Sequence, residues 1–314
     1  MRGSFAVLVT GFVFLAGCNV LLGTCGLEAD LDATSGAGGG AAGAGAGIGD
    51  GGGGNGQSKC ADVCGTPGCG TCPPLEMVAI PGAIPFQIDA KEVTNAEYQA
   101  FVATNPELSP EDDCEDNQSY EQGALAPAAL NVEAGEVLAD YMVWLDSDEP
   151  GDDRPAVFVD WCDANAYCKW AGKRLCDSFD GLVYEVDASE PAAATDPSTS
   201  RWFVACTGSP ATLYPYGDTL QESWCNYDNS GPDDVGTHPQ CEGGYDGLLD
   251  MSGNVAEWEN GCSQFGNPES WNQNCLARGG TWHLGGPTSC DAFRDVPRYN
   301  MSREIGFRCC SIVE

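Results

Sequence analysis

The stretch GFRCCSIV, Gly306 to Val313, predicts a strand near the C-terminal end of the chain. Side chains of a strand alternate between its two faces, so Cys309 and Cys310 are expected to point in opposite directions. Each therefore needs its own disulfide partner. This one strand is predicted to be tied to two other parts of the chain.

The stretch VDWCDANAYCKWAGKRL, residues 159–175, predicts a helix that Asp160 caps and Gly172 ends. Within it, Cys162 and Cys168 fall on different faces, about 9 Å apart along the axis. They cannot bridge each other, so each needs a distant partner. A second helix, from about Asn95 to Thr104, is predicted because Thr94 and Glu97 form a capping box.

The N-terminal residues indicate export. An apolar run from Phe5 to Leu15 is too short to span a bilayer and is typical of a secretory signal. The following Leu15-Ala16-Gly17-Cys18 is similar to a bacterial lipobox, so residues 1–18 are predicted to be a lipoprotein signal peptide with Cys18 as the lipidated first mature residue. The alternative is an ordinary cleaved signal with an incidental cysteine. The lipid would anchor the protein in the bacterial cell envelope, at the outer membrane.

Residues 19–58 are predicted to be a tether. Positions 31–58 are mostly Gly and Ala, with no large apolar side chain beyond Leu31 and Ile48. Such a segment buries too little surface to offset its ordering entropy. Residues 75–314 have ample aromatic and aliphatic side chains for one sizeable core.

Composition limits the partners. The formal net charge is -34, from 47 acidic and 13 basic residues, which disfavours nucleic acid and anionic membrane surfaces. Cations such as calcium, and basic or neutral surfaces, are compatible. The simpler explanation for most of these carboxylates is solubility outside the cell.

The cysteine count predicts disulfides. Setting Cys18 aside leaves 17 of the 18 cysteines, a density that indicates an oxidising compartment. Twelve lie from Cys114 onward. Four more form a small cluster within residues 59–74, at Cys60, Cys64, Cys69 and Cys72, so Cys25 is left without a partner. The cluster is interpreted as a disulfide knot; a zinc site is the alternative, because Cys69 and Cys72 have C-x-x-C spacing.

The rest of the pattern is irregular, with short apolar runs between many Gly, Pro, Asn and Asp residues. It indicates a loop-rich α+β domain. No nucleotide-binding, zinc-protease or nucleophile-elbow motif occurs, and His238 and His283 are the two histidines.

Six motifs resemble, in order and spacing, those of the formylglycine-generating enzyme (sulfatase-modifying factor) family: EVTNAEYQAFV, PAVFVDWCDANAYCKWAGKRL, YPYGD, YDGLLDMSGNVAEW, RGGTW and GFRCC. The resemblance covers residues 77–310. It implies a disulfide-rich, loop-rich variant of the C-type-lectin-like fold with bound calcium. Some members of the family oxidise a cysteine of sulfatases to formylglycine with copper and oxygen, and many have no obvious chemistry.

The resemblance also implies metal ligands. It assigns one calcium site to the Asn254 side chain, the Val255 carbonyl and Glu257, a set of oxygens that suits calcium. The alternative is that Asn254 and Glu257 only cap the turn. A second site would use Asn226 and Asp228.

The disulfide partners are predicted on two grounds. The resemblance implies Cys168 with Cys309. Proximity in the sequence gives four further hypotheses, which are Cys176–Cys206, Cys225–Cys241, Cys262–Cys275 and Cys290–Cys310.

The remaining question is whether Cys290 is catalytic. Copper-dependent members hold Cu(I) with two cysteines, and soft sulfur ligands suit that ion. Cys290 matches the second of them. Arg294, Arg298 and Thr281 match neighbouring positions, but the first cysteine is missing and Leu284 or Gly285 stands in its place.

His283 is a substitute ligand in principle, although a single histidine in a bend is more often a surface or packing residue. Copper is therefore not expected. The sequence favours a calcium-stabilised binding module for an envelope or extracellular protein or glycan. The alternative is an oxidoreductase of the formylglycine-generating type acting on a protein cysteine, with Cys290, Thr281 and Arg294 in its site.

Overall fold

The computed structural model describes residues 59–109, 114–123, 151–179, 184–185, 200–227, 230–263, 273–283 and 288–313. All of them belong to the compact unit Asn55–Glu314, which is separate from the unit Met1–Gly54. The predictions for the signal, Cys18, Cys25 and the tether up to residue 58 therefore lie outside the described residues. No helix of the described part is long and apolar enough to cross a membrane.

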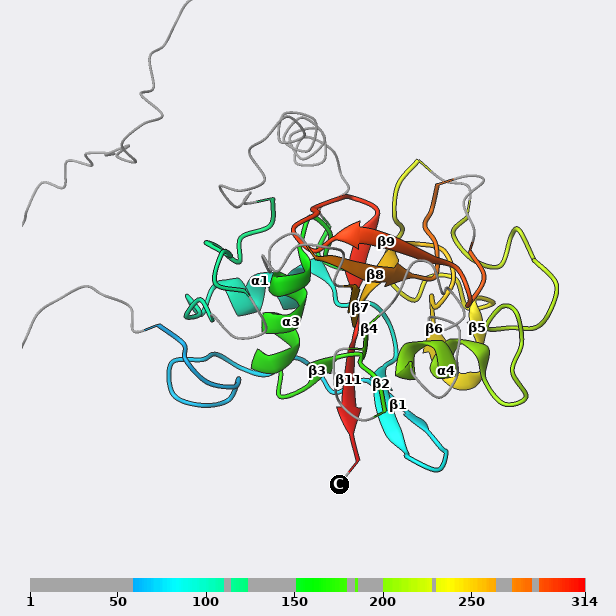
Figure 1. The fold of residues 1–314 in the computed structure, drawn as a ribbon, viewed down its shortest axis with the longest axis horizontal. Helices are drawn as coiled ribbons and strands as arrows, with labels where there is room; N and C mark the ends of the chain where they lie inside the picture. The colour runs from blue at the N-terminus through cyan, green and yellow to red at the C-terminus, as the bar shows by residue number, and fades with distance from the viewer. Residues whose placement is uncertain are drawn as a thin grey trace, which may run out of the picture. The chain divides into compact units, whose positions relative to one another are not determined.

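Three described helices and eleven strands make up the domain (Figure 1). The helices are α1 (Asn95–Val102), α3 (Trp161–Trp170) and α4 (Arg201–Thr207). The strands are β1 (Met77–Ile80), β2 (Phe86–Asp89), β3 (Arg174–Leu175), β4 (Tyr184–Glu185), β5 (Glu242–Gly243), β6 (Tyr245–Leu249), β7 (Ala256–Ser263), β8 (Asn274–Arg278), β9 (Phe293–Pro297), β10 (Ile305–Phe307) and β11 (Cys309–Ile312).

The strand predicted at the C-terminal end lies inside a sheet of order β1-β2-β11-β3. Cys310 of β11 lies opposite Ile88 of β2 and Arg174 of β3, in antiparallel register. A second sheet has the order β10-β7-β8-β9, with β4 also paired to β7. Strands β10 and β11 follow one another, so the GFRCC motif joins the two sheets.

Both predicted helices are present, with the expected caps. Thr94 and Glu97 form a capping box at α1, and Asp160 and Asp163 form one at α3. The helices pack their aromatic side chains together, with ring centroids of Phe101 and Tyr167 5.8 Å apart. The short apolar run RWFVAC, residues 201–206, lies in α4, and Ser200 caps this helix by accepting a hydrogen bond from the Phe203 N–H.

The cysteine cluster is a disulfide knot, with bonds Cys60–Cys69 and Cys64–Cys72. The zinc alternative is therefore wrong, since each of the four sulfurs is part of a disulfide. The knot lies on the C-terminal ends of both helices: the Cys64 N–H donates to the Trp170 carbonyl at 2.8 Å, and the Cys60 N–H donates to the Asn105 carbonyl at 3.2 Å. The first bond satisfies a carbonyl that the end of α3 leaves free, and the second holds the turn that follows α1.

The structure joins Cys168 to Cys309, Cys225 to Cys241 and Cys262 to Cys275, the pairs that the sequence predicted. Cys162, whose partner was left open, is bonded to Cys114. Two predicted pairs are wrong. Cys176 bonds to Cys310 instead of Cys206, and Cys290 bonds to Cys206 instead of Cys310.

The exchange of partners has a physical reason. Cys176, Cys206, Cys290 and Cys310 all lie in one buried cluster, together with Ile88 and Trp202. Because β3 pairs directly with β11, Cys176 lies beside Cys310 although 134 residues separate them. Sequence proximity to Cys206 was therefore the wrong criterion for predicting the partner of Cys176.

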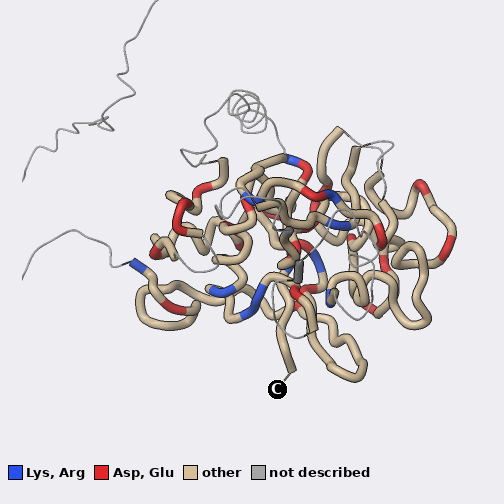
Figure 2. Tube along the Cα trace, viewed as in Figure 1, with Lys and Arg blue, Asp and Glu red and all other residues tan. Residues whose placement is uncertain are grey.

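Figure 2 shows acidic and basic positions interspersed along the trace around these cores.

The carboxyl groups of Asp160 and Asp163 at the start of α3 are buried, and each accepts a hydrogen bond from the backbone of the other residue. The Asp163 N–H donates to Asp160 Oδ1 at 2.9 Å, and the Asp160 N–H donates to Asp163 Oδ2 at 3.2 Å. Burial raises the pKa of Asp160 to about 6. Burial and the charge of Asp160 raise the pKa of Asp163 well above its usual value. The folded state therefore holds these protons more tightly than the unfolded chain does.

This arrangement predicts that the domain becomes more stable as the pH falls from about 7 toward 4, because protonation favours the state with the raised pKa. Each proton taken up on folding contributes a slope of up to about 1.4 kcal/mol per pH unit. Asp160→Asn keeps the helix cap but does not titrate, so it should flatten the slope. Urea unfolding at several pH values measures it. Asp152→Asn, at an exposed position, is the matched control, and a slope equal in both variants would contradict the prediction.

Candidate functional site

The turn before β7 carries the first predicted calcium site. Gly253 and Asn254 have φ angles of 78° and 56°, in the left-handed region. A Cβ on Gly253 would lie 2.5 Å from the Asn226 carbonyl oxygen, so the close approach of the two segments requires glycine there. The Asn254 N–H donates to the same carbonyl at 2.9 Å. The two predicted sites are thus neighbours.

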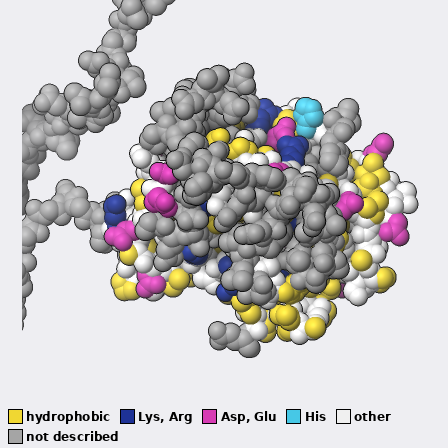
Figure 3. Space-filling model, in the orientation of Figure 1, with side chains coloured by type: hydrophobic (Ala, Val, Ile, Leu, Met, Phe, Trp, Pro, Cys, Tyr) yellow, Lys and Arg dark blue, Asp and Glu magenta, His cyan; other side chains and the backbone are white. Residues whose placement is uncertain are grey.

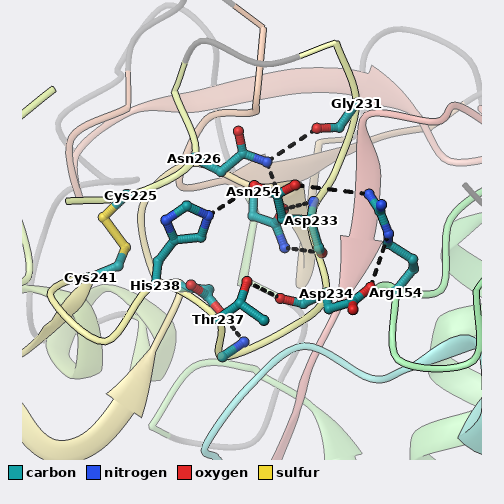
Figure 4. A network of polar contacts seen from close by, with 12 residues as sticks. Arg154, Cys225, Asn226, Gly231, Asp233, Asp234, Thr237, His238, Cys241 and Asn254 are labelled. Atoms are coloured by element: carbon teal, nitrogen blue, oxygen red, sulfur yellow. Dashed lines mark hydrogen bonds and ion pairs between the residues drawn. A yellow bond between two sulfur atoms is a disulfide. The ribbon is translucent and has the colours of Figure 1, made fainter. Parts of the chain in front are cut away.

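The Asn254 side chain connects three segments (Figure 4). Its Oδ1 accepts hydrogen bonds from Asn226 Nδ2 at 3.1 Å and from the Asp233 N–H at 2.8 Å. Its Nδ2 donates to Glu92 Oε1 at 2.9 Å. Both ends of the amide are engaged within the protein. This supports the alternative in which Asn254 organises the turn.

Glu257 does not fit a calcium ligand. Arg308 donates from Nε to Oε2 at 2.7 Å and from Nη2 to Oε1 at 2.8 Å, and Trp202 Nε1 also donates to Oε2 at 2.7 Å. Both side chains of the ion pair are 0–1% exposed. A guanidinium ion already neutralises this carboxylate, and a calcium ion would have to displace it. Val255, the third predicted residue, packs its side chain in an apolar cluster with Trp282.

Asn226 fits calcium better than Asn254. Its Nδ2 donates to the Gly231 carbonyl and to Asn254, whereas its Oδ1 accepts no hydrogen bond from the described residues and points away from these contacts in Figure 4. Amide oxygens are suitable calcium ligands. Asp228, its predicted companion, lies outside the described residues. No group of three or more His, Cys, Asp or Glu in the described ranges converges on a metal position.

The loop around Asn226 is closed by the Cys225–Cys241 disulfide and by two side-chain contacts that the sequence did not suggest. His238 Nε2 lies 2.9 Å from Asp233 Oδ2, and Arg154 Nε lies 3.0 Å from Asp234 Oδ1. These side chains are partly exposed, so each pair contributes at most about 1 kcal/mol. The disulfide is the stronger constraint on the loop.

The predicted catalytic residues do not form a thiol site. Cys290 is fully buried and bonded to Cys206, so it is neither a free nucleophile nor a copper ligand in this state. Thr281 is 1% exposed, and its hydroxyl accepts from the His283 N–H. Arg294 Nη1 donates to Glu304 Oε2 at 2.6 Å. All sixteen cysteines of the described ranges are in disulfides.

His283, the substitute copper ligand, also has another partner. Its side chain is 63% exposed, and its Nδ1 lies 3.8 Å from Glu304 Oε1. Leu284 and Gly285 lie outside the described residues. Arg298 packs over the Trp161 ring, at 4.5 Å from its centroid, and donates to both sulfurs of Cys114–Cys162. The arginines near Cys290 thus have structural contacts.

A family model, the sulfatase-modifying factor enzyme 1-like domain, matches residues 53–312. The chain belongs to this family. It is 28% identical over 212 residues to the formylglycine-generating enzyme of Bos taurus, a match that covers 59% of this chain and 50% of that protein. It is 27% identical over 273 residues to the formylglycine-generating enzyme of Streptomyces coelicolor, covering 72% of this chain and 78% of that protein. The chain spans about half the length of the bovine enzyme.

Among solved structures, CarF is similar over 77% of this chain and 99% of its own, with 19% identity and a TM-score of 0.47. The family match, the observed helices and sheets and the disulfides confirm the predicted fold class, a loop-rich and disulfide-rich α+β domain of the formylglycine-generating type. Arg308 is the residue that the sequence interpretation missed. It stands in the GFRCC motif, and a single arginine in a predicted buried strand implies a buried acidic partner.

The Glu257–Arg308 ion pair leads to a prediction that distinguishes a structural role of Glu257 from a role as a calcium ligand. Glu257→Gln should lower the free energy of unfolding by about 3–5 kcal/mol, because it leaves a buried guanidinium without its counter-charge. The double variant Glu257→Gln, Arg308→Met should recover part of the loss. Urea unfolding in chelator and in calcium measures both.

The matched control is Glu304→Gln, which breaks the half-exposed pair with Arg294 and should cost less than about 1 kcal/mol. A loss for Glu257→Gln that occurs in calcium and disappears in chelator would instead assign Glu257 to the metal.

Proposed function

We propose that the chain is an exported lipoprotein whose sulfatase-modifying factor domain binds a partner and performs no cysteine oxidation. The observation that carries this proposal is the Cys206–Cys290 disulfide, whose two residues are 0% exposed. A copper site of the family type needs thiolate ligands, and sulfur atoms bonded to each other supply none. The alternative, an oxidoreductase acting on a protein cysteine, requires this buried bond to open first.

The surface supports an uncharged or basic partner. Residues 77–88 and 309–313 contain no charged side chain, although the chain has a net charge of -34. Ile84, Ile312 and Val313 are 48%, 39% and 48% exposed. Hydrophobic side chains gather at the lower edge in Figure 3, where Figure 1 places the β1–β2 hairpin and the end of β11. An apolar edge on an acidic protein favours contact with an envelope or extracellular protein or glycan that carries no negative charge.

The anchor belongs to the same proposal. Lipid on Cys18 would hold the chain at the bacterial outer membrane, and the Gly/Ala-rich residues 31–58 would let the domain reach its partner.

Calcium is proposed at the second of the two predicted sites, the one formed by Asn226 and Asp228. Asn226 has an amide oxygen with no donor among the described residues, and Asp228 would add a carboxylate. Glu257 is left out because Arg308 holds it.

The proposal predicts that the purified protein neither binds Cu(I) tightly nor converts a sulfatase-type cysteine peptide to formylglycine. Thiol titration of the denatured, unreduced protein should detect no cysteine from residues 59–314, because every one there is paired. Peptide mass spectrometry is the activity assay. Aldehyde formation that depends on copper and is lost in Cys290→Ser would sink the proposal and support the oxidase.

The calcium assignment predicts a higher melting temperature in millimolar calcium than in chelator, because a ligand that binds only the native state stabilises it. Asp228→Asn should remove most of this shift. Glu257→Gln should retain the shift, measured from its own lower baseline in chelator. Equal shifts in wild type and Asp228→Asn would contradict the assignment, and no shift in any variant would show that the domain needs no calcium.

A further inference from the structure

A pocket of about 350 Å³ lies between the cysteine knot and helices α1 and α3. Its volume is within the range of small-molecule sites, about 300 to 1,000 Å³. Residues 60–63 of the knot form one wall, and residues 106–109, after α1, form another. The pocket shares no lining residue with the Asn254 turn or with Cys290, so neither the calcium nor the thiol assignment explains it.

The walls of the pocket are held in place by hydrogen bonds to backbone carbonyls of the knot. The Glu107 N–H donates to the Cys60 carbonyl at 2.7 Å. On the other side, Trp170 Nε1 donates to the Cys69 carbonyl at 2.8 Å. Together with the two disulfides of the knot, these bonds fix the pocket before any ligand arrives. Preformed sites of this kind lose little entropy on binding.

Aromatic side chains line the buried end of the pocket. Phe101, Tyr120 and Trp170 are 1%, 6% and 4% exposed, and all three contribute to the lining. The Phe101 ring centroid lies 5.3 Å from that of Tyr120 and 5.5 Å from that of Trp170. Two apolar residues, Val63 and Leu108, line the pocket as well and are 40% and 41% exposed. A ligand therefore needs an apolar body.

Charge distinguishes the pocket from an ordinary apolar cavity. Asp62 and Glu107, both exposed, contribute carboxylates to the lining, and Lys169 contributes one ammonium group. The local balance is negative, as is the whole chain at -34. Aromatic side chains next to carboxylates favour positively charged organic groups, since the faces of the rings also attract cations. An anionic ligand is disfavoured by both the lining and the long-range field.

We propose that this pocket binds organic ammonium ions, with the apolar part of the ligand against Phe101, Tyr120 and Trp170 and the positive charge toward Asp62 and Glu107. The knot is then one wall of a binding site as well as a cap on the helices. Lys169 opposes the ligand charge and limits its affinity. The proposal does not depend on the partner that the apolar edge binds.

The test compares two probes of nearly the same shape on the full chain. Choline carries a quaternary ammonium group, and 3,3-dimethylbutan-1-ol is its uncharged isostere. Isothermal titration should give binding of choline and about tenfold weaker binding of dimethylbutanol, since the cation–aromatic and carboxylate contacts exist only for the charged probe. Equal binding of the two probes would overturn the charge selectivity, and no binding of either would overturn the site.

Surface variants then test the residues in opposite directions. Asp62→Asn and Glu107→Gln should each weaken choline binding about two- to fivefold, and Lys169→Gln should strengthen it by a similar factor. Asp246→Asn, an exposed carboxylate on β6, is the control and should change nothing. A purely structural role of the three side chains would not give effects of opposite sign. Unchanged affinity in all three variants at unchanged melting temperature would refute the proposed binding mode.

Discussion

Strand β11 ties the domain together because its two adjacent cysteines point to opposite sides of one sheet. Cys309 bonds to Cys168 of α3, in the core that contains Tyr98 and Trp258. Cys310 bonds to Cys176, in the core that contains Trp202 and Met251. The bonds close loops of 141 and 134 residues, and a loop of about 100 residues is associated with roughly 4.7 kcal/mol in the chain-entropy model. One short strand thus couples the two hydrophobic cores.

The residue just before these cysteines adds an electrostatic constraint at the same place. Arg308 donates to the carbonyls of Asp89 in β2 and Leu249 in β6 as well as to the carboxylate of Glu257 in β7. Its guanidinium therefore links the strands of three sheets. Fully buried charges are stable only when paired and hydrogen-bonded in this way. In this structural role both carboxylate oxygens of Glu257 accept hydrogen bonds from Arg308.

The parts of the fold that could be predicted from the sequence are those set by local chemistry. The capping boxes at Thr94 and Asp160 are short-range hydrogen-bond patterns, so they located α1 and α3 to within about two residues. The pairs Cys225–Cys241 and Cys262–Cys275 close short loops and were also predictable. Family resemblance gave Cys168–Cys309.

The parts that could not be predicted depend on which strands are neighbours. The partner of Cys176 follows from the β3–β11 pairing, and that of Cys290 from the packing of α4 in the same core; no local pattern encodes either. The partner of Glu257 is likewise 51 residues away. For the candidate site, the sequence identified Asn226, Asn254 and Cys290 as residues of interest, but the chemical state of each was set by a distant segment. The pocket beside the knot was not predicted, because the knot and the helices meet only in the folded chain.

The disulfides also help to explain how such an acidic chain keeps a compact core. Eight acidic residues are buried among the described residues, against four arginines: Asp89, Glu92, Asp160, Asp163, Asp177, Asp250, Glu257 and Glu259 against Arg201, Arg278, Arg298 and Arg308. Burying more carboxylates than cations costs stability unless some of them are protonated. Eight disulfides offset such a cost by restricting the unfolded chain. One of them joins Cys206 to Cys290, so the bonds that stabilise this acidic domain also hold the Cys290 sulfur in a buried disulfide.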